Sequence, residues 1–144
     1  MSRRLTVLVS ALAIFLAGCA AHSARRAEVR ANESAGRDSA EHWLQLLDQG
    51  DYAEAFEYEA QDFRMRQSQT GFIRSMQARR APFGQTIGRK FIGAANLHKM
   101  VGLPEGNYES VLFKTAFEKK SETAERVILV QQSVGWRVVD YRIY

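Results

Sequence analysis

Beyond the first 37 residues, apolar side chains recur at the three- and four-residue spacing of amphipathic helices. Three helices are predicted, with apolar faces formed by Ala40, Trp43, Leu44 and Leu47, then Tyr52, Ala55 and Phe56, then Phe72, Ile73 and Met76. Asp38, Asp51 and Ser68 stand at the expected N-caps, because each offers a side-chain oxygen to the free amides of a first turn. Gly50 is expected to end the first helix and Pro82 the third.

After Pro82 the spacing changes to the alternation typical of strands. Four strands are predicted, over residues 87–97, 108–118, 126–132 and 136–144. The third should be central, because it is apolar on both faces, and residues 118–123 are expected to form a polar hairpin loop. Helices followed by strands indicate an α+β domain, with three N-terminal helices packed on one face of an antiparallel sheet of about four strands.

The stretch from Leu5 to Ala17 has a different pattern, because it is apolar nearly throughout. As a helix it would span roughly 20 Å, less than the ~30 Å core of a bilayer. Arg3 and Arg4 precede it and small residues follow it, which is the order of a secretory signal. The residues Leu16-Ala17-Gly18-Cys19 resemble the lipobox of bacterial lipoproteins.

This resemblance implies lipid transfer to the Cys19 sulfur, cleavage before Cys19 and acylation of the new amine. It divides the chain into a signal peptide at 1–18, a membrane-proximal tether at 19–37 and one domain at 38–144. Ala20 stands where an aspartate would imply retention at the inner membrane, so the resemblance implies the periplasmic face of the outer membrane. An ordinary cleaved signal and an uncleaved anchor are the alternatives.

The net charge of +4 lies entirely in the first 37 residues. From Asp38 to Tyr144, 14 basic residues balance 14 acidic ones, which removes the electrostatic basis for binding nucleic acid. The tether contributes four arginines beside the expected membrane anchor. They either contact anionic headgroups or only keep a spacer soluble. The spacer itself is expected to be coiled or partly helical.

An ordered set of residues marks the domain: Trp43-Leu44, Asp48, Gly50-Asp51-Tyr52, Phe63-Arg64, Arg80 to Gly84 with Arg89, Leu103 to Tyr108, and Trp136-Arg137-Val138 with Tyr141. This order is similar to a bacterial family known as domain of unknown function 4019, whose members are often exported or lipidated. The resemblance covers the whole domain and implies a cone-shaped fold of the nuclear-transport-factor-2 and cystatin-like group, without implying an activity. Phe72 departs from the family pattern, which has a tryptophan at this place.

Four residues are candidates for contact with a ligand: Arg80, Arg89, Tyr108 and Trp136. The two arginines flank a turn that contains Pro82 and Gly84, and their planar guanidinium groups are suited to a carboxylate or a phosphate. The alternative for Arg80 is a purely structural role at the end of a helix, where a cation complements the helix dipole. The alternative for the aromatic residues is simple packing in the core.

Asp140 is the candidate general base of an isomerase- or dehydratase-type enzyme, since strict alternation would place it on the face of Trp136 and Val138. An ion pair with Arg142, or with Arg126 or Lys114 across the ladder, is the simpler interpretation.

The chain has one cysteine and three widely separated histidines, so no metal site and no cofactor are expected. No catalytic set converges in the sequence. The leading expectation is therefore a non-enzymatic module of the cell envelope, held at the membrane by its lipid and binding an envelope protein or a small ligand. The enzyme with Asp140 as its base is one alternative, and a structural module within a larger envelope complex is another.

Overall fold

The computed structural model of the protein describes residues 22–28, 30 and 35–144. The predicted signal peptide and Cys19 lie outside the described residues. The chain divides into two units between Ser34 and Ala35. In the first unit residues 22–28 are helical, so this part of the predicted tether is the helical alternative and not coil. Among the residues described, no helix is both long and apolar enough to cross a membrane.

The second unit begins with a helix at residues 35–49, followed by α2 (Tyr52–Glu57), α3 (Gln61–Arg64) and α4 (Gln69–Arg80). The caps predicted for α2 and α4 are confirmed, because the Asp51 side chain accepts a hydrogen bond from the amide of Glu54, and the Ser68 side chain accepts one from the amide of Gly71. The four-residue helix α3 was not predicted, since it is too short to show a periodic apolar face.

The prediction of Asp38 as an N-cap is wrong. The helix is already formed at Ala35, and the hydroxyl of Ser39 donates to the Ala35 carbonyl at 2.8 Å, one helical turn earlier. Asp38 instead lies on the surface and pairs with Arg37 at 3.5 Å. The opposite end of this helix is as predicted, because Gly50 follows it with a φ of 79°, the left-handed conformation that favours glycine.

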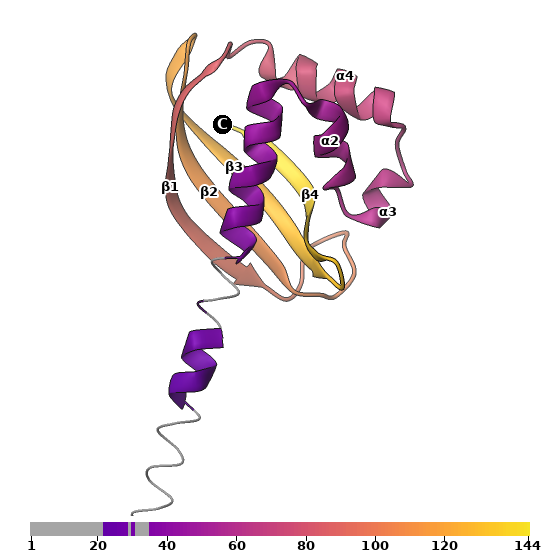
Figure 1. Cartoon of the computed structure of the whole chain (residues 1–144), viewed down its shortest axis with the longest axis vertical. Helices are drawn as coiled ribbons and strands as arrows, with labels where there is room; N and C mark the ends of the chain where they lie inside the picture. The colour runs from indigo at the N-terminus through magenta and orange to yellow at the C-terminus, as the bar shows by residue number, and fades with distance from the viewer. Residues whose placement is uncertain (1–21, 29, 31–34) are drawn as a thin grey trace, which may run out of the picture. The chain divides into compact units, whose positions relative to one another are not determined.

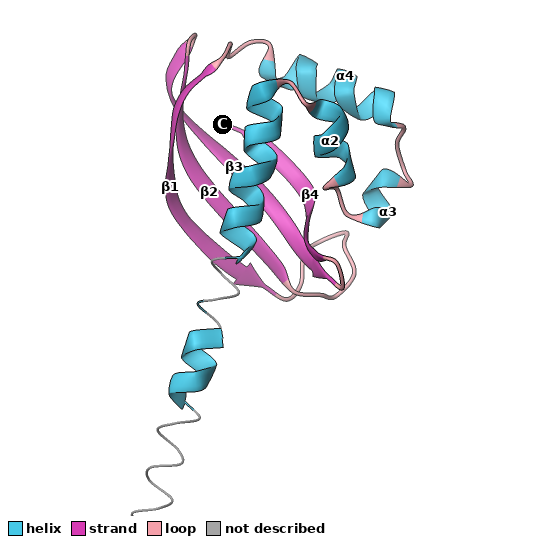
Figure 2. Cartoon of the chain, in the orientation of Figure 1, coloured by secondary structure: helices cyan, strands magenta, loops and turns pink. Residues whose placement is uncertain are grey.

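The sheet is an antiparallel meander of four strands, in the order β1-β2-β3-β4. Their bounds are β1 (Thr86–Leu97), β2 (Tyr108–Phe117), β3 (Lys120–Gln132) and β4 (Gly135–Ile143). The expected central position of the third strand is confirmed, but β3 starts six residues before the predicted residue 126, and only residues 118–119 remain between β2 and β3. The helices of the second unit lie across one face of the curved sheet (Figures 1 and 2).

Strand β4 contains a bulge that the alternation of its sequence does not reveal. Asp140 pairs with Ile128 and Val138 pairs with Leu129, which leaves Val139 without a place in the register. An inserted residue of this kind reverses which face the following side chains occupy. Val138 and Tyr141 therefore both belong to the core under the helices, and the prediction that Asp140 shares a face with Trp136 and Val138 is wrong.

The main core fills the space between the helices and the sheet, where Trp43, Leu44, Val111 and Val127 are fully buried. Phe72 also belongs to this core, and its ring lies 5.5 Å from that of Phe56 between centroids.

A second, smaller cluster lies on the other side of the sheet. It joins Tyr108, Ile128 and Val139 to Ala60, with Met100 and Leu103 of the β1–β2 loop packed against it and Phe63, Leu97 and Val130 beside them. This cluster covers part of the sheet face opposite the helices.

Candidate functional site

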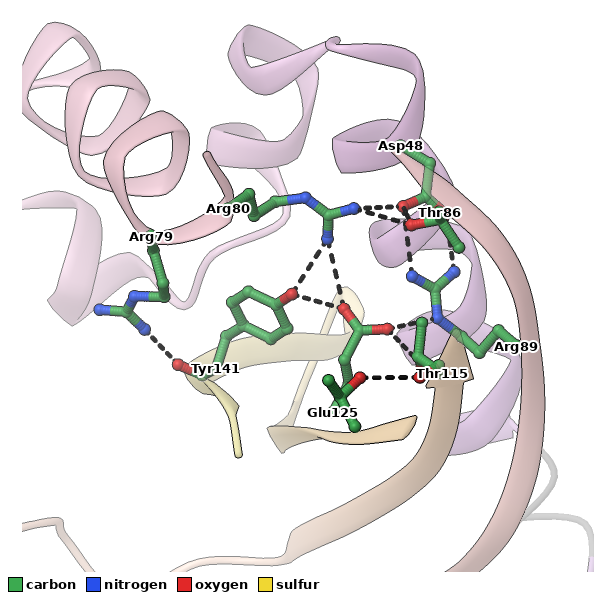
Figure 3. A network of polar contacts seen from close by, with 9 residues as sticks. Asp48, Arg79, Arg80, Thr86, Arg89, Thr115, Glu125 and Tyr141 are labelled. Atoms are coloured by element: carbon green, nitrogen blue, oxygen red, sulfur yellow. Dashed lines mark hydrogen bonds and ion pairs between the residues drawn. The ribbon is translucent and has the colours of Figure 1, made fainter. Parts of the chain in front are cut away.

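A buried polar network occupies one end of the interface between helices and sheet (Figure 3). Its members come from six elements and are Asp48, Arg80, Thr86, Arg89, Thr115, Glu125 and Tyr141. The confirmed helix ends at Gly50 and near Pro82 place Asp48 and Arg80 in the last turns of their helices, above the sheet. The strands supply the other side chains from the face that points toward the helices.

The guanidinium of Arg80 links α4 to four other elements: the helix at residues 35–49, β1, β3 and β4. Its Nη2 donates to Asp48 Oδ1 at 2.5 Å and to the Thr86 hydroxyl at 3.1 Å. Its Nη1 donates to Glu125 Oε1 at 3.3 Å and to the Tyr141 hydroxyl at 3.0 Å. The Arg80 side chain is only 6% exposed, so these contacts replace water almost completely.

Arg89, on β1, contacts the same two carboxylates from the opposite side. Its Nε donates to Glu125 Oε2 at 2.7 Å, and its Nη1 and Nη2 donate to the two oxygens of Asp48 at 2.7 and 3.2 Å. The paired bonds to Asp48 are the forked geometry in which arginine binds a carboxylate most strongly. Each carboxylate therefore lies between two cations.

Glu125 is the centre of the network and is fully buried. Its Oε1 accepts from Arg80 and from the Tyr141 hydroxyl at 2.5 Å, and its Oε2 accepts from Arg89 and from the Thr115 hydroxyl at 2.6 Å. Four donors on two oxygens occupy the sites that a carboxylate normally offers. Two arginines and two carboxylates also make the network neutral, which removes most of the cost of burying its charges.

The environment shifts the ionisation of these groups. Burial alone would raise the pKa of Asp48, but the hydrogen bonds and charges of Arg89 and Arg80, with the Thr86 hydroxyl, lower it overall. Burial and the charge of Glu125 raise the pKa of Tyr141 well above its usual range, so the phenol stays protonated. Burial opposes the charge on Arg89, but its bonds to Asp48 and Glu125 raise its pKa. Asp48 therefore stays ionised, Arg89 stays charged and Tyr141 stays neutral at neutral pH.

A hollow of about 380 Å³ adjoins the network at the surface. Asp48, Arg80 and Thr86 form part of its wall, and the rest comes from neighbouring residues that include Tyr52, Gln77 and Lys119. Asp48 is the most exposed of the four charged network members, with 23% of its side chain accessible. The hollow therefore meets the network at a carboxylate whose two oxygens are already bound by arginines.

Comparison with known proteins gives a family for this chain. The family described as "Protein of unknown function (DUF4019)" matches residues 39–141, most of the chain. The chain belongs to the DUF4019 family. The fold agrees with what that resemblance implied, since helices cover one face of a curved antiparallel sheet.

The search of curated proteins found no match for this DUF4019 protein. Among solved structures, it is similar to a crystal structure described as a putative NTF2-like transpeptidase from Campylobacter jejuni. The two share 13% sequence identity with a TM-score of 0.48, and the match covers 71% of this chain and 94% of the other.

The structure brings together two of the four predicted ligand-contacting residues of this DUF4019 domain. Arg80 and Arg89 do converge on carboxylates, but these are Asp48 and Glu125 of the same chain. Tyr108 lies in the second cluster and donates its hydroxyl to the Pro104 carbonyl at 2.7 Å. Trp136 lies in the main core and is 5% exposed.

Asp48 and Tyr141 were noted in the sequence only as part of the family pattern and not as site residues, and Glu125 was not identified at all. A signal for Glu125 was present, because it shares its strand face with Val127 and Leu129, where a charged side chain must find a buried partner. Asp48 has no such signal of burial, because it stands in the polar last turn of a helix.

Asp140 lies away from the network, on the face of β4 opposite the helices. Its carboxylate accepts from Arg142 Nε at 3.0 Å, and 34% of its side chain is exposed. This is the ion pair that the sequence offered as the simpler interpretation. Among the residues described, no group of three or more histidine, cysteine or acidic side chains is arranged to hold a metal ion.

Proposed function

We propose that this DUF4019 protein is a lipid-anchored, non-enzymatic binding module of the cell envelope, attached through Cys19 at the periplasmic face of the outer membrane. The order of Arg3-Arg4, the short apolar stretch and Leu16-Ala17-Gly18-Cys19 supports the anchor. The absence of aspartate at Ala20 supports the outer membrane.

The closed state of the polar network carries the non-enzymatic part of the proposal. A general base or nucleophile needs an atom that is free to reach substrate. Both oxygens of Glu125 and both oxygens of Asp48 are instead occupied by arginines and hydroxyls of the chain itself. The Tyr141 hydroxyl is likewise occupied, since it donates to Glu125 and accepts from Arg80. These groups hold elements of the fold together, so binding is assigned to the surface of the domain.

The isomerase- or dehydratase-type alternative depends on Asp140 being buried and unpaired against an apolar cavity. The ion pair with Arg142 and the partial exposure of Asp140 weigh against that arrangement. No other observation favours this reaction class, and we do not propose it.

Metabolic labelling with a fatty acid tests the anchor. Cells that produce the wild-type chain or a Ser23→Ala control should incorporate the label into the protein, and cells that produce Cys19→Ala should not. Equal labelling of all three chains would contradict lipid attachment at Cys19.

Crosslinking in intact envelopes tests the binding role. The wild-type protein should yield a reproducible partner that is lost when the anchor is removed. Recovery of no partner, together with turnover of a small molecule that Asp140→Asn abolishes, would replace the binding proposal with the enzymatic one.

A further inference from the structure

Half of the sheet face that points away from the helices is left open by the described residues. The second cluster and the β1–β2 loop cover the half around Tyr108 and Ile128. The other half presents Lys90, Ile92, Leu112, Lys114, Arg126 and Tyr144, and we call these six residues the open face.

The open face is apolar along its middle. Two shallow hollows, of about 350 and 550 Å³, share Leu112 and Tyr144 in their walls. The larger hollow is lined in part by three small residues of β1, Gly93, Ala94 and Ala95, whose short side chains leave it open. Ile92 on β1 and Tyr144, which follows β4, are 56% and 53% exposed, so both present apolar surface on this face.

Basic side chains surround the apolar middle of the open face, and some of them lie opposite one another on neighbouring strands, which is unfavourable for the stability of the sheet. Lys90 stands directly opposite Lys114 in the β1–β2 register, and Arg126 directly opposite Arg142 in the β3–β4 register. Like charges at such positions are destabilising. Glu122 pairs with Lys114 and Asp140 pairs with Arg142, so two cations, Lys90 and Arg126, have no acidic partner among the described residues.

Arg126 occupies the centre of this arrangement. Its guanidinium lies 5.5 Å from the ring centre of Tyr144, and its Nε has no hydrogen-bond partner within the described part of the chain. It also lines the larger hollow, next to Leu112 on the neighbouring strand. An arginine stacked on a tyrosine beside apolar side chains offers an anion a charged donor and offers its hydrocarbon an apolar surface.

We propose that the open face docks onto an anionic phospholipid surface, with Arg126 and Lys90 contacting headgroup phosphates and Ile92, Leu112 and Tyr144 reaching the acyl boundary. This rests on the proposed anchor at Cys19. Fifteen residues separate Cys19 from Ala35, so the domain stays within about 60 Å of the membrane even if that segment is fully extended. A lipid surface is therefore always present at high local concentration, and this favours it over an acidic protein partner.

A lipid-borne quencher tests this docking in the mature, lipidated protein. Because the proposed lipid occupies the Cys19 sulfur, a cysteine introduced as Ser110→Cys, in the larger hollow, takes a fluorophore selectively. Thr70→Cys, at an exposed position on α4, gives the comparison on the helical side. In vesicles that contain phosphatidylglycerol, the probe at residue 110 should be quenched several-fold more than the probe at residue 70. The difference should disappear in phosphatidylcholine vesicles and at high salt, which screens the charges.

Charge variants complete the experiment. Removal of one cation by Arg126→Gln or Lys90→Gln should lower the ratio of docked to undocked protein about fivefold, the usual effect of one basic side chain at an anionic surface. Arg74→Gln, at an exposed position of α4, also removes one positive charge and should leave the ratio of docked to undocked protein unchanged.

Equal quenching at residues 110 and 70 in anionic vesicles would overturn the proposal, as would a difference between the two probes that is just as large in neutral vesicles. Specific crosslinking of residue 110 to an envelope protein, without the lipid-dependent difference, would also overturn it in favour of a protein partner. Loss of fatty-acid labelling at Cys19 is a separate result, and that result would remove the anchor itself.

Discussion

Arg89 holds both carboxylate oxygens of Asp48, with Nη1 2.7 Å from Oδ2 and Nη2 3.2 Å from Oδ1. This bidentate pair fastens the end of the helix at residues 35–49 to β1, at the edge of the sheet. Arg80 reaches the same carboxylate from α4, so one side chain fixes two helices and a strand relative to one another. Arg80 and Arg89, which the sequence suggested as ligand-binding residues, therefore stabilise the fold by binding carboxylates of the same chain.

Replacement of Arg80 should destabilise the domain strongly. Arg80→Met leaves Glu125 fully buried with one cation fewer, and breaking a buried pair in this way costs about 3–5 kcal/mol. Urea denaturation measures this loss in the free energy of unfolding. Arg74→Met, an exposed arginine on the same helix, should change it by no more than about 0.5 kcal/mol. Equal effects of the two substitutions would mean that the network contributes nothing to the fold.

Glu59 should make the domain less stable as pH rises toward neutrality. Burial raises its pKa from 4.5 to about 7, against the opposing hydrogen bond from Gln67 and the charges of Arg64 and Arg79. Between about pH 4.5 and pH 7 the folded protein therefore binds a proton that the unfolded chain has released. Stability is fully present below that interval and is lost as pH rises through it.

The substitution Glu59→Gln removes this dependence. At about pH 8 it should stabilise the protein by about 1–3 kcal/mol, because a neutral amide no longer has to be buried as an anion. Denaturation at a series of pH values measures the effect, with Glu105→Gln on the surface as the control. If the pH dependence of stability were the same with and without Glu59→Gln, this would contradict the raised pKa of Glu59.

The helix caps give a direct contrast between two aspartates. Asp51→Ala removes the acceptor of the Glu54 amide and should cost about 1 kcal/mol of stability. Asp38→Ala should cost only a few tenths, because Asp38 lies inside a helix and makes one exposed contact with Arg37. Thermal unfolding of the two variants would resolve the difference. The reverse order would show that the helix begins at Asp38 after all.

Gly36 should be intolerant of any side chain. A Cβ at this position would lie 1.6 Å from the Oε2 atom of Glu109, whose side chain is fully buried. Gly36→Ala should therefore destabilise the domain by about 1–3 kcal/mol, the usual cost of overpacking. Gly93→Ala meets no atom within 4 Å and serves as the control in the same denaturation experiment. Equal stability of the two variants would mean that Glu109 moves aside freely.

The elements that local sequence specifies were predictable. Ser68 and Asp51 cap their helices through bonds to residues three positions away, and Gly50 ends a helix through its own backbone conformation. The prediction of Asp38 as an N-cap failed because a helix that continues through an aspartate has the same local sequence pattern as a helix that begins at one. The bulge at Val139 was invisible because Val138 and Val139 are both valines, so the sequence does not show which of them is the inserted residue.

The polar network could be predicted only in part, because its partners are distant in sequence. Arg80 and Arg89 were recognised as convergent from the turn between them. Their acceptors are Asp48, 32 residues before Arg80, and Glu125, 45 residues after it. Only the register of the sheet and the packing of α4 bring these groups together, and neither can be read from the spacing of charges along the chain.

The mass of the mature N-terminus tests the central claim most directly. The protein is extracted from envelopes, digested, and its first peptide is analysed by mass spectrometry. The proposal predicts a peptide that begins at Cys19 and carries both the lipid on its sulfur and an acyl group on its amine. A mature chain that begins at another residue, or that begins at Cys19 with a free thiol, would contradict it.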